Sequence, residues 1–329
     1  MMRLLAQLRG FEASGTLLQA RGLVRQWCEQ RGLQCGEVSA LHRLSGGMIN
    51  HVWRVESACG DLILKIADEQ VSSVGEVQLS PQRLVFEVRA LNALRNSDFL
   101  LEVLRDLNHI QGADVWDVYA PMVYIEDVHE HALVQEYRSG CVGFEDWARV
   151  SEGKVEGLCE VLGYVVGRMH GASFVKGMSA WCGDMLNMSV QRVRQEVQYR
   201  GVRRWLEAES CAADVIDEVS QASEALGDVF AGRDGGVCFV MGDLWPGSIL
   251  VQEEARTLSW IDWEFAHWGY PGQDVGHWLA HLWLCGDKIE NGARGDEFKR
   301  ASRVFLEGYT RGLAHDDVVF LSEGEYARQ

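Results

Sequence analysis

The first half of the chain alternates short β-prone hydrophobic runs with turns that contain Gly, Ser and Asp. The first three runs are residues 41–44, 51–56 and 62–66. Runs of this length, separated by such turns, predict three antiparallel strands that follow one another along the chain. After Pro81 the apolar residues recur at helical spacing, so we expect a helix over residues 81–95 that packs on the sheet. Two more strands are expected, at residues 118–126 and 132–137.

The second half of the chain has mainly helical patterns. The long amphipathic stretches are residues 155–170, 190–209, 213–230, 275–284 and 297–313. Short strand-like runs interrupt them at residues 238–241, 248–252 and 257–261. The Arg138-Ser139-Gly140 break suits a linker, so we expect an N-terminal lobe over residues 1–137 and a C-terminal lobe over residues 138–329. The predicted class is α+β, with an antiparallel sheet and a helix in the first lobe and mainly helices in the second.

Composition and charge narrow the choice of partners. A chain of 329 residues with 47% hydrophobic residues can bury a large core, in one domain or in two lobes. The formal charge of -17 argues against a nucleic-acid backbone or an anionic membrane surface as the main partner. A neutral or cationic small substrate fits this charge better.

Cysteine use and hydropathy indicate where the protein resides. The nine cysteines are scattered and odd in number, which is typical of reduced thiols in the cytoplasm. An arginine-biased N-terminus is a weak mitochondrial signal, and an ordinary amphipathic helix explains it better. Since no apolar run approaches about 18 residues, we expect no membrane span and a cytoplasmic protein.

Acidic residues and a hydroxyl group stand on the turns that follow two of the short strands in the second half. They are Asp243, Ser248, Asp262 and Glu264. Phosphoryl transfer requires a carboxylate that orients the acceptor hydroxyl and oxygen ligands that hold Mg²⁺ against the phosphates of ATP. Asp also favours turns for purely structural reasons, but the joint setting of these residues favours the chemical interpretation.

Residues of the first half supply a candidate phosphate clamp. Lys65 ends the third strand and Glu87 lies on the helix that follows, so an ion pair would aim the ammonium at phosphates. A strand-terminal Lys is more often a solvated edge residue, and Glu87 together with the downstream acids favours function. Gly46 and Gly47, in the turn that leads to Asn50, would let backbone N–H groups approach phosphate oxygens. Taken alone, such a turn is more often a simple hairpin.

These motifs together resemble a known family. The run Met241-Gly242-Asp243-Leu244-Trp245-Pro246-Gly247-Ser248 resembles the H-G-D-x-x-x-x-N loop of the aminoglycoside phosphotransferase and choline kinase family. Ile261-Asp262-Trp263-Glu264 resembles its metal-binding I-D-W-E. The Ser-Gly-Gly turn, Lys65 and Glu87 fall in the family's order, so the resemblance covers roughly residues 40 to 285. Ser248 and the D-x-E pattern are closest to the 5-methylthioribose kinase branch and its fungal relatives.

The resemblance implies a two-lobed, protein-kinase-like fold that moves the γ-phosphate of ATP onto a hydroxyl of a small molecule. It implies that Asp243 is the catalytic base or orienting carboxylate. It also implies that Asp262 binds Mg²⁺ and that Glu264 and Ser248 are further metal ligands. Asp274 would support the catalytic loop.

The same resemblance implies a nucleotide site in the first lobe. The backbone of Gln135, Glu136 and Tyr137 would meet the adenine, while Lys65 and Glu87 would serve the phosphates. ATP and Mg²⁺ are therefore the expected cofactors. The acceptor is expected to be a sugar-like or amine-bearing alcohol, and the oligomeric state stays open.

Two departures from the family pattern keep an alternative open. Met241 stands where the family has His, and Ser248 replaces the usual Asn, whose role as an oxygen ligand a hydroxyl can take. The readable helices end near Leu313, which leaves open whether the wall of the acceptor pocket is short or supplied by a partner. The alternative function is therefore a catalytically weak or inactive nucleotide-binding scaffold of the same fold.

One further pattern has a plainer interpretation. His277 and His281 are spaced like the two histidines of a zinc-binding helix. Trp278 stands where that motif requires Glu, so we do not expect these histidines to bind a metal.

Overall fold

The computed structural model describes most of the chain. The described residues are 4, 6–9, 17–44, 49–68, 79–96, 99–100, 102–103, 106–107, 116–176, 184–231, 237–287 and 292–314.

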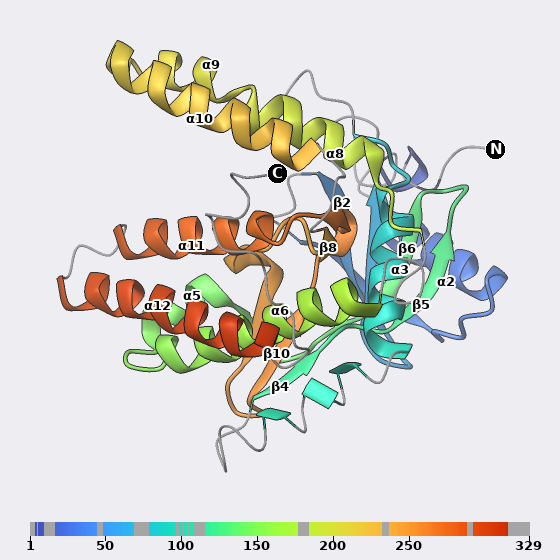
Figure 1. Ribbon diagram of the computed structural model, residues 1–329. Coiled ribbons are helices and arrows are strands. Elements are labelled where there is room, and N and C mark those ends of the chain that lie inside the picture. The colour runs from blue at the N-terminus through green and yellow to red at the C-terminus, as the bar shows by residue number, and fades with distance from the viewer. Residues whose placement is uncertain are drawn as a thin grey trace.

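Five strands form an antiparallel sheet in the order β1-β2-β3-β6-β5. Their bounds are β1 Val38–Arg43, β2 Asn50–Ser57, β3 Leu62–Ala67, β5 Val123–Asp127 and β6 Ala132–Glu136. The three consecutive strands expected from the sequence pair in the predicted order, because the turns between them are short. Figure 1 shows this sheet on one side of the molecule and the long helices on the other.

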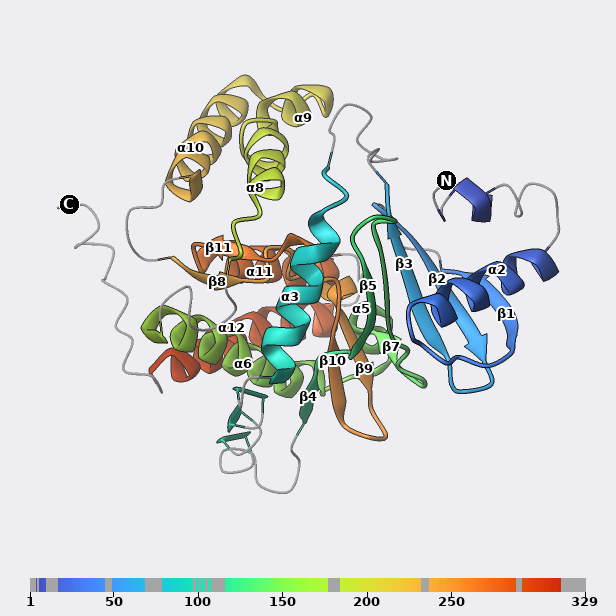
Figure 2. The same ribbon diagram turned by 90° about the vertical axis from the view of Figure 1, so that its right-hand side faces the viewer.

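Side-chain alternation along β3 gives the sheet two different faces. Leu62, Leu64 and Ile66 join the buried cluster that includes Val24 and Trp27 of α2 (Leu17–Gln30). The intervening residues of a strand point the opposite way. That opposite face packs against α3 (Arg83–Asn96), where Leu84 and Val88 contact Ala67 and Leu133. Figure 2 shows α2 and α3 on opposite sides of the sheet.

The single strand expected over residues 118–126 is wrong. The segment forms two strands, β4 (Asp117–Tyr119) and β5, which belong to different sheets. β4 pairs in parallel with β10 (Thr257–Trp260), whereas β5 pairs with β6. Pro121 lies between the two strands and lacks the N–H group that a continuous ladder would need, so the chain passes from one sheet to the other there.

The rest of the chain is mainly helical, as expected. Its helices are α5 Phe144–Val150, α6 Val155–Lys176, α8 Met188–Arg194, α9 Val202–Ala208, α10 Ala213–Ala231, α11 Gly272–Asp287 and α12 Gly292–Ala314. The helix expected over residues 190–209 is interrupted, because a π-helical turn (Gln195–Tyr199) separates α8 from α9. In Figure 2 the hairpin of α8, α9 and α10 projects above the rest of this part.

Short strands within the helical part carry the loops of interest. They are β7 Val142–Gly143, β8 Cys238–Val240, β9 Ile249–Gln252, β10 and β11 His267–Gly269. β10, β9, β7 and β4 form a four-stranded sheet, and β8 pairs with β11. The α+β class with an antiparallel sheet and a helical part is confirmed. The division into lobes at residues 137 and 138 stays a prediction.

Two glycines on each helix bring α6 and α12 into close contact. A Cβ added to Gly163 would lie 2.1 Å from the carbonyl oxygen of Phe305, and one added to Gly308 would lie 2.2 Å from that of Glu160. Gly167 and Gly312 are equally tight against the opposite backbone. The crossing therefore depends on residues without a side chain.

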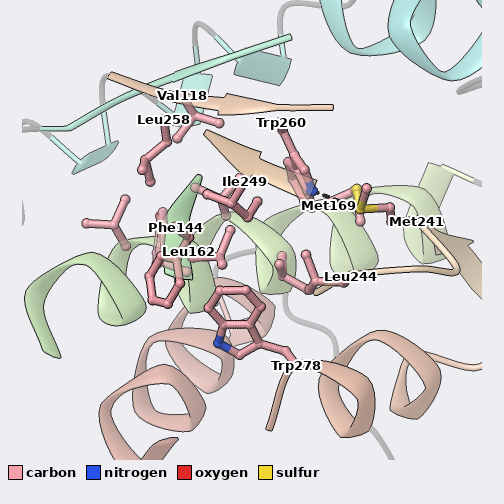
Figure 3. Packing of buried hydrophobic residues seen from close by; sticks show 14 of the residues in the cluster. Val118, Phe144, Leu162, Met169, Met241, Leu244, Ile249, Leu258, Trp260 and Trp278 are labelled. Atoms are coloured by element: carbon pink, nitrogen blue, oxygen red, sulfur yellow. Dashed lines mark hydrogen bonds between the residues drawn. The ribbon is translucent and has the colours of Figure 1, made fainter. Parts of the chain in front are cut away.

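The main buried cluster lies under the loops that follow β8 and β10. Figure 3 shows Met241, Leu244, Trp260 and Trp278 packed together in this cluster. Among the described helices, none combines the length and the hydropathy needed to cross a membrane.

Candidate active site

A cavity of about 430 Å³ opens between the five-stranded sheet and the loops of the helical part. Residues from both parts of the chain line it, among them Asn50, Lys65, Gln135, Asp243, Asp262 and Glu264. Its volume is within the range of ordinary small-ligand sites, about 300 to 1,000 Å³. The fold thus brings the candidate phosphate-clamp residue Lys65 and the acidic residues of the second half of the chain to one cavity.

Lys65 is held between two carboxylates at the edge of this cavity. Lys65 lies on the face of β3 that packs against α3. Its Nζ donates to Glu87 Oε1 at 2.6 Å and also to Asp262 Oδ1. Lys65 and Glu87 are both buried. Burial acts to lower the pKa of Lys65, but the charges of Asp262 and Glu87 outweigh it and raise the pKa above the ordinary value. The ammonium therefore stays charged.

Asp262 begins the turn after β10 in an unusual backbone conformation. Its φ of 63° and ψ of 56° lie in the left-handed region, which Asp tolerates better than most residues. The side chain is 40% exposed and lines the cavity. Its carboxylate is thus available to a ligand from the cavity side, and strained backbone of this kind is frequent at functional sites.

Glu264 is bound by two residues from the first part of the chain. Its Oε2 accepts from Arg83 Nε at 2.8 Å and from Asn50 Nδ2 at 2.8 Å, and Arg83 Nη2 donates to Asn50 Oδ1 at 2.7 Å. Both of these hydrogen bonds fall on Oε2. Among the described residues none is found on Oε1, which can therefore accept from a water molecule or bind a metal ion.

Arg83 completes this network, and no motif in the sequence marks it. The side chain is fully buried and also donates to four backbone carbonyl oxygens, those of Ile49, Asp68, Leu79 and Ser80. A basic residue in the first turn of a helix carries no sequence signal for such a role. The network joins β2, α3 and the turn after β10.

Asp243 lies in the loop after β8. The residue before it, Gly242, has a backbone conformation and a close contact that only glycine permits. Gly242 has a φ of +79°, and a Cβ there would lie 2.3 Å from the carbonyl oxygen of Phe265. The Asp243 side chain is 30% exposed and lines the cavity. Burial raises the pKa of Asp243 to about 6; the charge of Arg194 opposes this rise, and neighbouring carboxylates add to it. Such a carboxyl can take up a proton near neutral pH.

Asp274 supports this loop from below. Its Oδ2 accepts from Met241 N at 2.7 Å and from His170 Nε2 at 3.2 Å, and its Oδ1 accepts from Gly242 N at 2.8 Å. His170 is in turn 3.0 Å from the Tyr309 hydroxyl. Burial acts to raise the pKa of Asp274, but the hydrogen bonds from His170 and the backbone outweigh it, so the pKa is below the ordinary value.

Met241 and Ser248, the two departures from the family pattern, are both hydrogen-bonded to other residues of the protein. Trp260 Nε1 donates to Met241 Sδ at 2.9 Å, which ties the position of the family His into the core (Figure 3). The Ser248 hydroxyl donates to Trp245 O at 2.7 Å and accepts from Trp245 N at 3.2 Å. Ser248 is fully buried, so its role as a metal ligand stays a prediction that requires this loop to open.

The residues expected at the nucleotide base lie at another wall of the cavity. Gln135, Glu136 and Tyr137 all line it. The Glu136 carboxylate accepts hydrogen bonds from Tyr119 and Arg138, so its side chain is already engaged. Gly46 and Gly47 lie outside the described residues.

In the described part of the chain, no group of three or more His, Cys, Asp or Glu side chains is arranged so that it could hold a metal ion by itself. Asp262 and Glu264 nevertheless supply carboxylate oxygens at the cavity, the ligands that Mg²⁺ prefers. The donor set therefore fits a metal ion that arrives with further oxygen ligands from phosphates and water.

Sequence comparison places the chain in a known family. Residues 40–313 match the model of the phosphotransferase enzyme family. The 4-hydroxytryptamine kinase of Psilocybe cubensis is 23% identical over 297 residues, which cover 85% of this chain and 76% of the relative. Methylthioribose kinase 2 of Oryza sativa subsp. japonica is 24% identical over 265 residues, which cover 76% of this chain and 58% of the relative.

A solved structure supports the fold. A crystal structure from Ralstonia eutropha, assigned to an aminoglycoside phosphotransferase, superposes with a TM-score of 0.53. The match covers 88% of this chain and 79% of the other, at 14% sequence identity. The expected protein-kinase-like fold is confirmed.

Proposed function

The chain belongs to the phosphotransferase enzyme family and is a small-molecule kinase, and we propose that it transfers the γ-phosphate of ATP to a hydroxyl group of a small acceptor. The observation that carries the proposal is that Lys65, Asp262 and Asp243 face one cavity. A cation, a metal-binding carboxylate and a candidate base are the groups that this reaction needs.

Lys65 binds the phosphates of the nucleotide in this proposal. Its ammonium is buried and charged, and Glu87 keeps it in place from the side of α3. Phosphates would give Lys65 a new partner and Mg²⁺ would give one to Asp262, in place of the contact between these two residues. Mg²⁺, held by Asp262 and Glu264, would neutralise phosphate charge.

Asp243 orients the acceptor hydroxyl and takes its proton. The acceptor oxygen forms a bond to the γ-phosphorus while the bond from that phosphorus to the bridging oxygen breaks, and ADP leaves. A pKa of about 6 keeps Asp243 largely ionised at neutral pH and still basic enough to receive the proton. The backbone of Gln135, Glu136 and Tyr137 would bind the adenine.

Two observations support the proposed class of acceptor, the names of the relatives and the charge of the chain. The relatives are named for a hydroxytryptamine and a methylthioribose, which are an amine that carries a hydroxyl group and a sugar derivative. The formal charge of -17 favours a neutral or cationic acceptor over an anionic one. The described cysteines are free thiols, which supports a cytoplasmic location.

Phosphorus NMR of the protein with Mg-ATP and a panel of hydroxyindole amines, thioribose, choline and aminoglycosides tests the proposal. We expect a phosphate monoester and ADP with at least one acceptor, and a loss of turnover by orders of magnitude in Asp243→Asn with nucleotide binding retained. Nucleotide binding without product from any acceptor would favour the inactive scaffold instead.

A further inference from the structure

The two histidines that resemble a zinc motif lie beside Asp243. Both are on α11, and His277 Nδ1 is 3.6 Å from Asp243 Oδ1. His277 Nε2 is 3.2 Å from His281 Nε2, and the His281 ring packs on Trp245, whose ring centroid is 5.6 Å away. Trp245 lines the cavity. The histidine pair therefore links the cavity wall to the candidate base.

His277 has an unused hydrogen-bonding atom at this contact. Its Nδ1 is buried and has no hydrogen-bond partner among the described residues. A buried polar atom without a partner is costly, so it marks a place where a contact forms in another state. Catalytic hydrogen bonds are often long before the substrate binds and shorten in the complex.

The neighbouring charges determine which nitrogen of His277 carries the proton. If His277 Nε2 donated to His281, a lone pair on Nδ1 would face the carboxylate of Asp243, which is repulsive. If His281 donates, His277 carries its proton on Nδ1, directed at Asp243. Electrostatics therefore favours the second arrangement.

His277 is neutral in this setting. Burial lowers its pKa to about 3, and the charge of Arg194 and the nearby His281 add to the effect. The charged groups around Asp243 are Arg194 of α8, Asp262 and Glu264 of the turn after β10, and Asp274 of α11. A neutral imidazole can donate a hydrogen bond without changing this balance of charge.

Resting on the proposed function, we propose that His277 is a positioning residue for Asp243. Its Nδ1–H donates to Asp243 Oδ1 when substrates bind, and this leaves Oδ2 to accept the hydroxyl of the acceptor. His281 holds the His277 ring and its tautomer. Met241 stands where the family has His, and its sulfur accepts a hydrogen bond from Trp260 in the core. The pair of His277 and His281 therefore supplies Asp243 with the polar support that Met241 does not give.

Three replacements of His277 separate this role from simple packing. Asn carries its amide nitrogen close to the position of Nδ1, whereas Gln carries its nitrogen close to that of Nε2, and Leu carries none. We expect His277→Asn to keep kcat within about threefold of the wild type, because the donor is kept. We expect His277→Gln and His277→Leu to lower kcat by about 10- to 100-fold with little change in the KM of ATP or acceptor, because one hydrogen bond to a charged group is lost.

A matched control and a second measurement keep the test decisive. His129→Leu, an exposed change in the turn between β5 and β6, should leave kcat unchanged. Nitrogen-15 NMR of the wild type should show His277 neutral and protonated on Nδ1 between about pH 6 and 8. This readout does not depend on turnover or on the stability of a variant.

The possible failures are distinct. Wild-type protein that makes no product with any acceptor overturns the proposed function. Full kcat in His277→Leu, equal losses in the Asn and Leu variants, or a proton on Nε2 overturns the positioning role alone.

Discussion

Replacing Asp274 by Asn should loosen the loop that carries Asp243. The fully buried Asp274 carboxylate accepts three hydrogen bonds, two on Oδ2 and one on Oδ1. Asn has the same shape but only one acceptor oxygen, and its NH₂ group is a donor. Whichever way the amide is oriented, a donor of the loop or of His170 faces another donor.

The size of the effect follows from these contacts. The less damaging orientation keeps the oxygen toward Met241 N and His170, and loses the bond from Gly242 N at 2.8 Å. Loss of one charge-assisted hydrogen bond, together with an unpaired buried donor, costs about 2 to 4 kcal/mol of unfolding free energy. This is a large part of the roughly 5 to 15 kcal/mol that stabilises most proteins.

The pH dependence has a defined sign. The pKa of Asp274 is lowered in the folded state, so its contribution to stability is present above the unfolded pKa and is lost as pH falls through the lower folded pKa. The difference between wild type and Asp274→Asn should therefore be full at neutral pH. It should shrink as pH falls below about 4, the ordinary value for Asp.

Urea unfolding followed by tryptophan fluorescence measures this difference, and kcat measured on the folded variant reports the displacement of Asp243. Asp296→Asn is the control, because the exposed pair of Asp296 with Lys299 contributes at most about 1 kcal/mol. An unfolding free energy within about 0.5 kcal/mol of the wild type, the range of neutral surface changes, would refute the reasoning.

Three further predictions concern the base, the phosphate clamp and the helix crossing. Because Asp243 must be ionised and its pKa is raised to about 6, kcat/KM should fall about tenfold per pH unit below that value; a flat profile down to pH 5 would contradict this. Glu87→Gln removes one of the two carboxylates at Lys65, and calorimetry should show Mg-ADP binding roughly tenfold weaker, whereas unchanged affinity would exclude the clamp. Gly308→Ala places a Cβ 2.2 Å from a backbone oxygen of α6, so the unfolding free energy should drop by about 1 to 3 kcal/mol despite the better helix propensity of Ala; an increase would show that α6 and α12 can separate without loss.

Most elements of the fold could be predicted from local patterns. The strands β1, β2 and β3 and the helix α3 lie within a few residues of their expected bounds, because alternation and helical spacing report which face of each element is buried. The failures have local causes as well. Residues 118–126 have one hydrophobic pattern but contribute to two sheets, and the pattern of residues 190–209 does not reveal the π-helical turn.

The candidate site could be predicted where a motif carried it. Asp243, Asp262 and Lys65 stand out by spacing and by neighbouring residue types, and the structure brings all three to one cavity. Arg83 carries no comparable signal, and the spacing of His277 from His281 does not indicate that His277 lies beside Asp243. A buried Arg in the first turn of a helix and a His on an amphipathic helix look like many others in any sequence.

The sequence by itself determined the α+β class, the order of the elements and the residues of the phosphotransferase motifs, because periodicity and turn chemistry act over a few residues. Only the tertiary structure decided the network of Arg83, Asn50 and Glu264. Arg83 is 181 positions from Glu264 along the chain, and Asn50 is 214 positions from it. It also decided which backbone N–H groups Asp274 binds in the loop that carries Asp243, and that His277 lies next to Asp243. Contacts of this kind depend on how separate elements pack against one another, and no local spacing along the chain encodes that packing.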